Sequence, residues 1–216
     1  STVTITINPP ANAVPTADAG ADQTVVSGTQ VALAGAGTDI DGTIAGYAWT
    51  RTGGTGGDIS TINFSNAAAS NPTFTDTSLT SNDTAVTHIF SLTVKDDDDA
   101  VSANVSTVTI TINPPANAVP TADAGADQTV VSGTQVALAG ASTDTDGTIA
   151  GYAWTRTGGT GDANNATLSS ATALNPTFTD SSLTSNDTSV THIFKLTVTD
   201  DDGADSTDVS TVTITI

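Results

Sequence analysis

The segment VTHIFSLTVKD, residues 86–96, alternates between side chains that suit a protein interior and side chains that suit a surface. Successive side chains of a β-strand point to opposite faces, so this alternation predicts a strand with one buried face. The inward side chains would be His88, Phe90, Leu92 and Val94. Shorter alternating segments, such as STVTITI at residues 106–112, are separated by Gly, Asn, Asp and Pro along the chain. This pattern is typical of an all-β fold.

The chain also repeats itself. Residues 1–36 recur without a change as residues 106–141, and the likeness continues to Ile216 with one glycine fewer in the second copy. A unit of about a hundred residues has the size of an independent domain with its own core and is too long for a solenoid repeat. We therefore expect two tandem seven-stranded β-sandwiches arranged end to end, the first in residues 9–112 and the second in residues 113–216.

One segment precedes the first predicted sandwich, and another opens the second as a linker. Residues 1–8 match the last strand of the repeat and are expected to be the terminal strand of a preceding repeat, unpaired unless another chain covers it. Residues 113–119 belong to the proline-rich stretch NPPANAVP, which predicts a semi-rigid linker because proline restricts the backbone. The unpaired strand makes self-association through residues 1–7 possible. The short linker leads us to expect contact between neighbouring repeats of the same chain.

The composition excludes several classes of partner. All 23 acidic residues are aspartate, and only four basic residues balance them, for a formal charge of −19. Such a polyanion repels nucleic acids and anionic membranes. No apolar run is long enough to span a bilayer, so direct membrane insertion is not expected. The chain has no cysteine, so its stability must come from packing and from any metal that it binds.

Aspartates gather at two places in each repeat. TDIDG at residues 38–42 and TDTDG at 143–147 read as loops, and the long strand is followed by Asp96–Asp99 in the first repeat and by Asp200–Asp202 in the second. In a sandwich of the immunoglobulin type the loops that carry these two clusters lie at the same end, where the linker also enters. The sequence therefore predicts that the two clusters of each repeat converge.

Converging carboxylates repel one another unless a cation binds, and Ca²⁺ takes six to eight oxygen ligands. An EF-hand is excluded, because its loop needs a glutamate and this chain has none. Asp-Gly segments can also be plain solvated turns. Recurrence of both clusters in both repeats favours calcium over that alternative.

The motif order N-x-x-P-x-A, V-x-L-x-G, D-x-D-G-x-I-x-x-Y-x-W and L-x-V-x-D resembles PKD-type (polycystic-kidney-disease-type) immunoglobulin-like domains over nearly all of each unit. In calcium-binding members of that family the linker asparagine, both aspartates of D-x-D-G and the aspartate after strand F hold the ion at the N-terminal end of the domain. The resemblance thus implies these ligands: Asn12, Asp39, Asp41 and Asp96, then Asn117, Asp144, Asp146 and Asp200. Asp97 and Asp201 are reserve ligands, and Asp18 and Asp123 are weaker candidates.

The chain departs from that family in two places. The family's W-D-F-G-D-G is replaced by WTRTGG, and the tyrosine position of strand F holds His88 or His192. Each histidine lies on the inward face of its strand, which favours a hydrogen-bonded structural role over a catalytic one. Trp49 and Trp154 could stack on sugars, but their place on a central strand favours the core. Paired aspartates could serve a glycosidase, yet no acid with a raised pKa in a cleft is indicated.

Near-identical tandem copies rich in Asp and Thr are similar to the extender regions of giant bacterial RTX-type surface adhesins. The resemblance implies a non-enzymatic, extracellular spacer at the cell surface, stiffened by Ca²⁺ at the junctions between domains. Two alternatives stay open. One is an extracellular filament subunit assembled by β-strand donation, and the other is an accessory carbohydrate-binding module of a secreted hydrolase.

Overall fold

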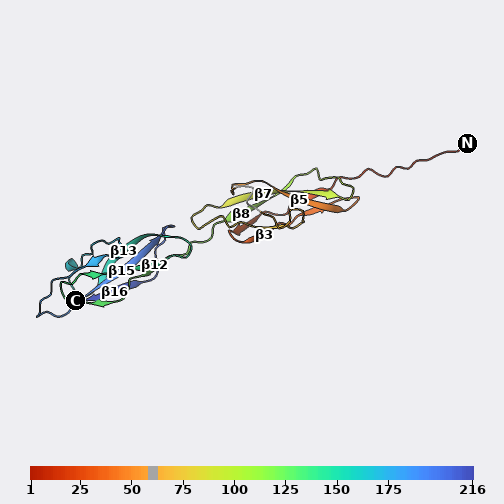
Figure 1. Ribbon diagram of the computed structural model, residues 1–216. Coiled ribbons are helices and arrows are strands. Elements are labelled where there is room, and N and C mark those ends of the chain that lie inside the picture. Colours follow the sequence, from red (N-terminus) through yellow and green to blue (C-terminus); the bar gives the residue numbers. More distant parts are fainter. Residues whose placement is uncertain (58–62) are drawn as a thin grey trace. The chain divides into compact units, whose positions relative to one another are not determined.

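The computed structural model describes residues 1–57 and 63–216 of the chain (Figure 1). The chain divides into two compact units, Ser1–Pro115 and Ala116–Ile216. Each unit is an all-β sandwich, which confirms the predicted fold class. Apart from the 3-10 turn Ala163–Asn165, the described residues contain no helix, and therefore no helix that could cross a membrane.

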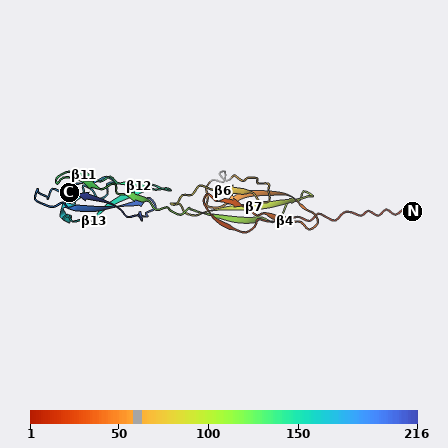
Figure 2. The same ribbon diagram turned by 90° about the horizontal axis from the view of Figure 1, so that it is seen from below.

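Unit 1 packs one four-stranded sheet against two short strand pairs. The sheet has the order β2-β8-β7-β5, in which β2 and β8 are parallel and the other neighbours antiparallel. The pairs are β1-β4 and β3-β6. The strands are β1 Thr16–Asp18, β2 Gln23–Val26, β3 Gln30–Ala32, β4 Ala36–Thr38, β5 Ile44–Gly53, β6 Thr73–Thr75, β7 Val86–Asp96 and β8 Ser106–Asn113. They run along the length of the unit in both views (Figures 1 and 2).

Unit 2 repeats this arrangement. Its four-stranded sheet has the order β10-β16-β15-β13, and its short pairs are β9-β12 and β11-β14. The strands are β9 Thr121–Asp123, β10 Gln128–Thr129, β11 Val136–Ala137, β12 Ala141–Thr143, β13 Ile149–Gly158, β14 Thr177–Phe178, β15 Thr191–Asp200 and β16 Ser210–Thr215. Two strands are shorter by two residues, since β10 has two where β2 has four and β16 has six where β8 has eight.

Each unit has eight described strands where seven were expected, because the first strand divides. β1 pairs with β4, whereas β2 crosses to the other layer and pairs with β8. Gly20 lies between them with a φ of +80°, and an added Cβ there would lie 2.7 Å from the carbonyl oxygen of Ala34. Glycine is therefore required where the chain changes layers.

The core of unit 1 lies between the layers. Phe90 and Leu92 of β7 are completely buried and belong to one apolar cluster with Val31 of β3 and Phe74 of β6. The alternation of residues 86–96 thus predicted the buried face of β7 correctly. Trp49 is also part of this cluster, with 3% of its surface exposed, and its indole Nε1 donates to the Ser70 carbonyl at 3.2 Å. A buried indole cannot stack on a sugar.

The two histidines are buried as well. His88 Nε2 lies 2.6 Å from Asp76 Oδ2, and His192 Nε2 lies 2.9 Å from Asp180 Oδ2. In unit 2 Arg156 Nε lies 3.4 Å from the other ring nitrogen, Nδ1. That nitrogen must then accept a hydrogen bond, so Nε2 carries the proton and donates to the aspartate. The histidine has a structural role, as its position on the strand indicated.

Residues 1–12 form no strand, and all of their side chains are exposed. The segment extends from unit 1 as the dark red end of the ribbon (Figure 1). Val3, Ile5 and Ile7 are 81–89% exposed, although the same seven residues form most of β8 when they recur at 106–112. The difference is the partner, since β8 lies between β7 and β2.

Candidate metal centre

The predicted ligands of unit 1 come from three segments that the fold brings together. They are the chain leading into β1, the loop between β4 and β5, and the end of β7. Asn12 Nδ2 donates to Asp96 Oδ2 at 3.0 Å, and the Ala13 backbone N–H donates to Asp41 Oδ2 at 2.9 Å. The leading segment is thus bonded to both acidic clusters, although it is 28 and 84 residues away from them in sequence.

Asp97 fastens the two loops to each other. Its Oδ1 accepts from the Thr43 backbone N–H at 2.6 Å, and its own N–H donates to the Thr43 carbonyl at 3.0 Å. The hydrogen bond from Thr43 lowers the pKa of Asp97 below its ordinary value. This residue, expected as a reserve ligand, therefore has a structural partner of its own.

Asp96 is the most buried of the predicted ligands of unit 1, with 1% of its surface exposed. Its Oδ1 accepts from the backbone N–H groups of Asp98 at 3.0 Å and Ala100 at 2.7 Å, while Oδ2 accepts from Asn12. These bonds close the turn that follows β7. The chain there includes Asp99 at a φ of +70°, so the turn needs this support.

Asp39 differs from the other carboxylates because both of its oxygens are buried without a hydrogen-bond partner. Burial raises the pKa of Asp39, and its carboxylate contact with Asp41 and the negative charges of Asp41 and Asp96 raise it further, which outweighs the opposite effect of the Asp41 backbone. A buried carboxylate that lacks donors costs free energy unless a cation or a proton compensates it. A cation bound beside Asp39 would compensate the buried carboxylate.

Gly42 explains the last position of the D-x-D-G motif. A Cβ at this residue would overlap Asp97 Oδ1 and would lie 2.7 Å from Asp39 Oδ2. Its φ is not in the left-handed region, so the backbone conformation is not the reason for glycine. The glycine is required because two carboxylates approach its Cα.

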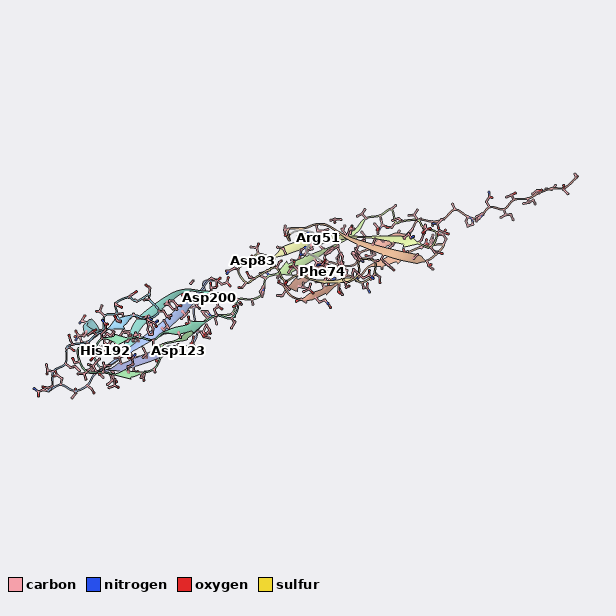
Figure 3. The ribbon with its side chains drawn as sticks, in the orientation of Figure 1. Arg51, Phe74, Asp83, Asp123, His192 and Asp200 are labelled. Atoms are coloured by element: carbon pink, nitrogen blue, oxygen red, sulfur yellow. The ribbon has the colours of Figure 1, made fainter. Side chains whose placement is uncertain are left out.

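Unit 2 builds the same arrangement. Asn117 Nδ2 donates to Asp200 Oδ2 and the Ala118 N–H donates to Asp146 Oδ2, both at 2.9 Å. Thr148 N–H donates to Asp201 Oδ1 at 2.7 Å, and Asp144 Oδ2 is again buried without a partner. Asp200 and His192 lie near opposite ends of β15 (Figure 3), which separates this cluster from the histidine–aspartate pair.

The fit of these residues to a calcium ion is partial. In residues 1–57 and 63–216 no group of three or more Asp, Glu, His or Cys side chains is arranged to hold a metal ion. Asp39 and Asp144 have free buried oxygens, but Asp41, Asp96 and their counterparts now accept hydrogen bonds. The weaker candidates Asp18 and Asp123 bond to the N–H groups of Gly20 and Gly125 instead. A complete site would need the asparagine and backbone oxygens in addition.

Sequence reasoning missed the backbone donors. Ala13 and Ala118 carry no functional side chain, so nothing in their identity indicates that their N–H groups hold Asp41 and Asp146. Thr43 and Thr148 were likewise not singled out. The only sequence feature that marks these two threonines is their position directly after the D-x-D-G motif.

The K319L-like PKD domain family model matches residues 19–112 and again residues 124–214. This match confirms the PKD resemblance in both repeats. No curated protein matches the chain.

Several solved structures are similar in fold. One is the PKD domain from KIAA 1837 protein, at 24% identity over 51% of this chain and 97% of that chain, with a TM-score of 0.36. Another is the PKD domain from human KIAA0319, at 14% identity over 52% and 93%, with a TM-score of 0.34. The titin domains z1z2 match at 14% identity over 96% and 98%, with a TM-score of 0.49. At these identities the likeness concerns the fold alone.

Proposed function

Because this chain belongs to the K319L-like PKD domain family, we propose that it is a structural spacer of an extracellular, calcium-dependent adhesin. Domains of this type are generally non-catalytic and are typically found outside the cell. Tandem units of nearly the same sequence suit a spacer, since each copy adds length without adding a new site. The net charge of −19 suits a role in which cations bind and screen the chain.

One observation supports the calcium part of the proposal. Asp39 in unit 1 and Asp144 in unit 2 hold buried carboxylate oxygens that no donor satisfies, at the same place in both copies. The same end of each unit holds Asp41 and Asp96, or Asp146 and Asp200. A bound Ca²⁺ would supply the missing positive charge.

The residues of this chain would act in distinct ways. Asp39 and Asp144 would bind the ion, joined by Asp41 and Asp146 and by the asparagine oxygens of Asn12 and Asn117. Asp96 and Asp200 are tied to backbone N–H groups and would hold the ligand loops in position. Asp97 and Asp201, bonded to the threonine that follows each D-x-D-G motif, would keep the two loops together. Because the asparagines precede the first strand of each unit, binding would also stiffen the chain that leads into the unit.

The experiment is a calcium titration of the whole chain, followed by thermal unfolding and by small-angle scattering. We expect Ca²⁺ to raise the melting temperature and reduce bending between units, and EGTA to reverse both effects. A ligand that binds only the folded state at about 100 times its Kd stabilises it by ~2.7 kcal/mol. The variant Asp39→Asn with Asp144→Asn should lose this response.

The matched control is Asp18→Asn with Asp123→Asn, which removes the same charge from positions that bond to glycine N–H groups. The control should keep the calcium response. Equal unfolding curves in millimolar calcium and in EGTA for the unchanged chain would refute the calcium part of the proposal and leave the spacer role to be argued from the repeat alone.

The exposed residues 1–7 favour a second candidate, a filament subunit that donates this strand to a neighbour. Val3, Ile5 and Ile7 present the apolar face that the matching residues bury in β8. β8 and β16 already supply the last strand of each unit, so neither described sandwich lacks the strand that residues 1–7 would provide. We therefore place the filament second.

A further inference from the structure

The first strand of unit 1 is fastened along its outer edge by side chains from the segment that leads into β8. β1 pairs on one side with β4. On the other side the Ala17 N–H donates to Asn104 Oδ1 at 2.9 Å, and Asn104 Nδ2 donates to the Ala17 carbonyl at 2.7 Å. The side-chain amide of Asn104 thus bonds to β1 as a backbone amide of a neighbouring strand would.

Unit 2 has an aspartate, Asp208, at the position that matches Asn104. The Ala122 N–H of β9 is shared between the two oxygens of this side chain, at 3.3 Å for Oδ1 and 3.1 Å for Oδ2. An ionised carboxylate has no hydrogen to donate, so Asp208 cannot give the Ala122 carbonyl the bond that Asn104 gives the Ala17 carbonyl. One shared donor therefore takes the place of two separate hydrogen bonds.

The other fastening of this edge is the same in both units. The Ala19 N–H donates to Ser106 Oγ at 2.9 Å, and the Ala124 N–H donates to Ser210 Oγ at 2.7 Å. β1 and β9 also have the same three residues and pair in the same register with β4 and β12. The change from amide to carboxylate therefore alters one of two fastening points of a three-residue strand, and a missing partner costs more there than on an exposed surface because the alanines are buried.

We propose that the side chain at position 104 or 208 is a latch of the first strand, complete in unit 1 and incomplete in unit 2, so that β9 detaches locally more often than β1 does. Detachment would expose Ala122 and leave the four-stranded sheet of unit 2 intact, because β9 is not part of that sheet. β9 directly follows the segment whose Asn117 and Ala118 bond to the acidic loops. The opening would therefore loosen the chain that leads into unit 2, while the matching chain of unit 1 stays fastened.

The test is amide hydrogen exchange of the whole chain, followed by nuclear magnetic resonance in EGTA so that the result does not depend on calcium. Ala17 and Ala122 both lie between threonine and aspartate, so their intrinsic exchange rates are matched. We expect the Ala122 N–H to exchange about fivefold or more faster, the factor that one net hydrogen bond corresponds to. Asp208→Asn should slow the Ala122 N–H by about this factor, and Asn104→Asp should speed the Ala17 N–H. In the Asp208→Asn variant the Phe194 N–H of β15 should exchange as before, because the opening is local.

The matched control is Asp208→Ala, which removes the charge without supplying a donor. It should speed the exchange of the Ala122 N–H, because that group loses its acceptor. Equal slowing by the alanine and asparagine variants would show that the charge alone matters and would overturn the latch. Equal slowing of the Ala122 and Phe194 N–H groups in Asp208→Asn would reveal a change in global stability and overturn local detachment. If Asp208→Asn leaves the Ala122 N–H unchanged, the proposal is also wrong, and the difference between the units belongs to Ser142, which faces Ala122 where Gly37 faces the matching alanine of unit 1.

Discussion

At the scale of single residues, two aspartates of unit 1 have pKa values that are shifted in opposite directions. Both carboxylate oxygens of Asp39 are buried without a hydrogen-bond partner, and burial together with the negative charges of Asp41 and Asp96 raises its pKa more than the backbone of Asp41 lowers it. Asp76 is also partly buried, which raises its pKa, but hydrogen bonds from the side chain and backbone of Ser78, and then from His88, outweigh this effect and lower it. Asp180 in unit 2 behaves as Asp76 does. The hydrogen bonds that Asp76 and Asp180 accept therefore decide the direction of their pKa shifts.

The sign for Asp76 and Asp180 gives a pH prediction. A carboxylate whose pKa is lower in the folded state contributes stability above its unfolded pKa of ~3.9, and the contribution is lost as pH falls through the folded pKa. We expect Asp76→Asn with Asp180→Asn to destabilise both units at pH 7. The deficit relative to the unchanged chain should shrink as pH falls below ~4. Urea unfolding followed by circular dichroism at pH 7, 4 and 2.5 measures it.

The control for this prediction is Asp98→Asn, which removes an exposed carboxylate. It should change the free energy of unfolding little at any of these pH values. A deficit of the double variant that stays constant from neutral to acid pH would contradict an electrostatic origin and would point to lost packing around His88 and His192.

At the scale of elements, the loops that carry the aspartates are separate from the strands that carry the core. Asp144 and Asp146 lie between β12 and β13, whereas Trp154 lies within β13 and is 3% exposed. The Trp154 indole also donates to the Leu174 carbonyl at 3.2 Å. Loss of the loop carboxylates and loss of the indole should therefore have different effects.

We expect Trp154→Ala to cost about 3–5 kcal/mol, because it truncates a large core side chain. Asp144→Ala with Asp146→Ala should leave unit 2 folded and reduce only its response to calcium. Chemical unfolding of each variant, with and without calcium, separates the two effects, and unit 1 provides an unchanged reference. Comparable loss of structure from both changes would show that the loop is part of the folding core.

The same division explains how much the sequence could predict. Phe90 and Leu92 were assignable to the core because alternation depends only on strand geometry, and the convergence of Asp39, Asp41 and Asp96 followed from sandwich topology. The division of the first strand at Gly20 and the bond from the Ser27 N–H to the Asn113 carbonyl were not assignable. Both features depend on which backbone N–H and C=O groups pair across the sheet, and the side-chain types do not indicate this pairing.

At the scale of the whole molecule, residues 1–7 could pair with the sheet of a second molecule. Residues 1–7 have the same sequence as 106–112 and 210–216, and these two later copies pair with β7 and β15. An intermolecular strand would therefore have to displace an intramolecular strand of identical sequence. The exchange gains no new apolar burial and loses the freedom of a second molecule, so it is unfavourable without another contact.

We therefore expect deletion of residues 1–8 to leave the melting temperature and the oligomeric state unchanged. The segment is exposed throughout, and the first bonds of unit 1 begin at Asn12 and Ala13, beyond the deletion. Ile5→Asp is the matched control, since it keeps the length of the tail and removes one side chain of its apolar face. Sedimentation and electron microscopy over a range of concentrations, with calcium present, measure the assembly. If the original chain forms filaments that both changes abolish, the displacement argument fails and strand donation replaces the spacer as the function of the chain, because only a docked strand would respond to the loss of Ile5.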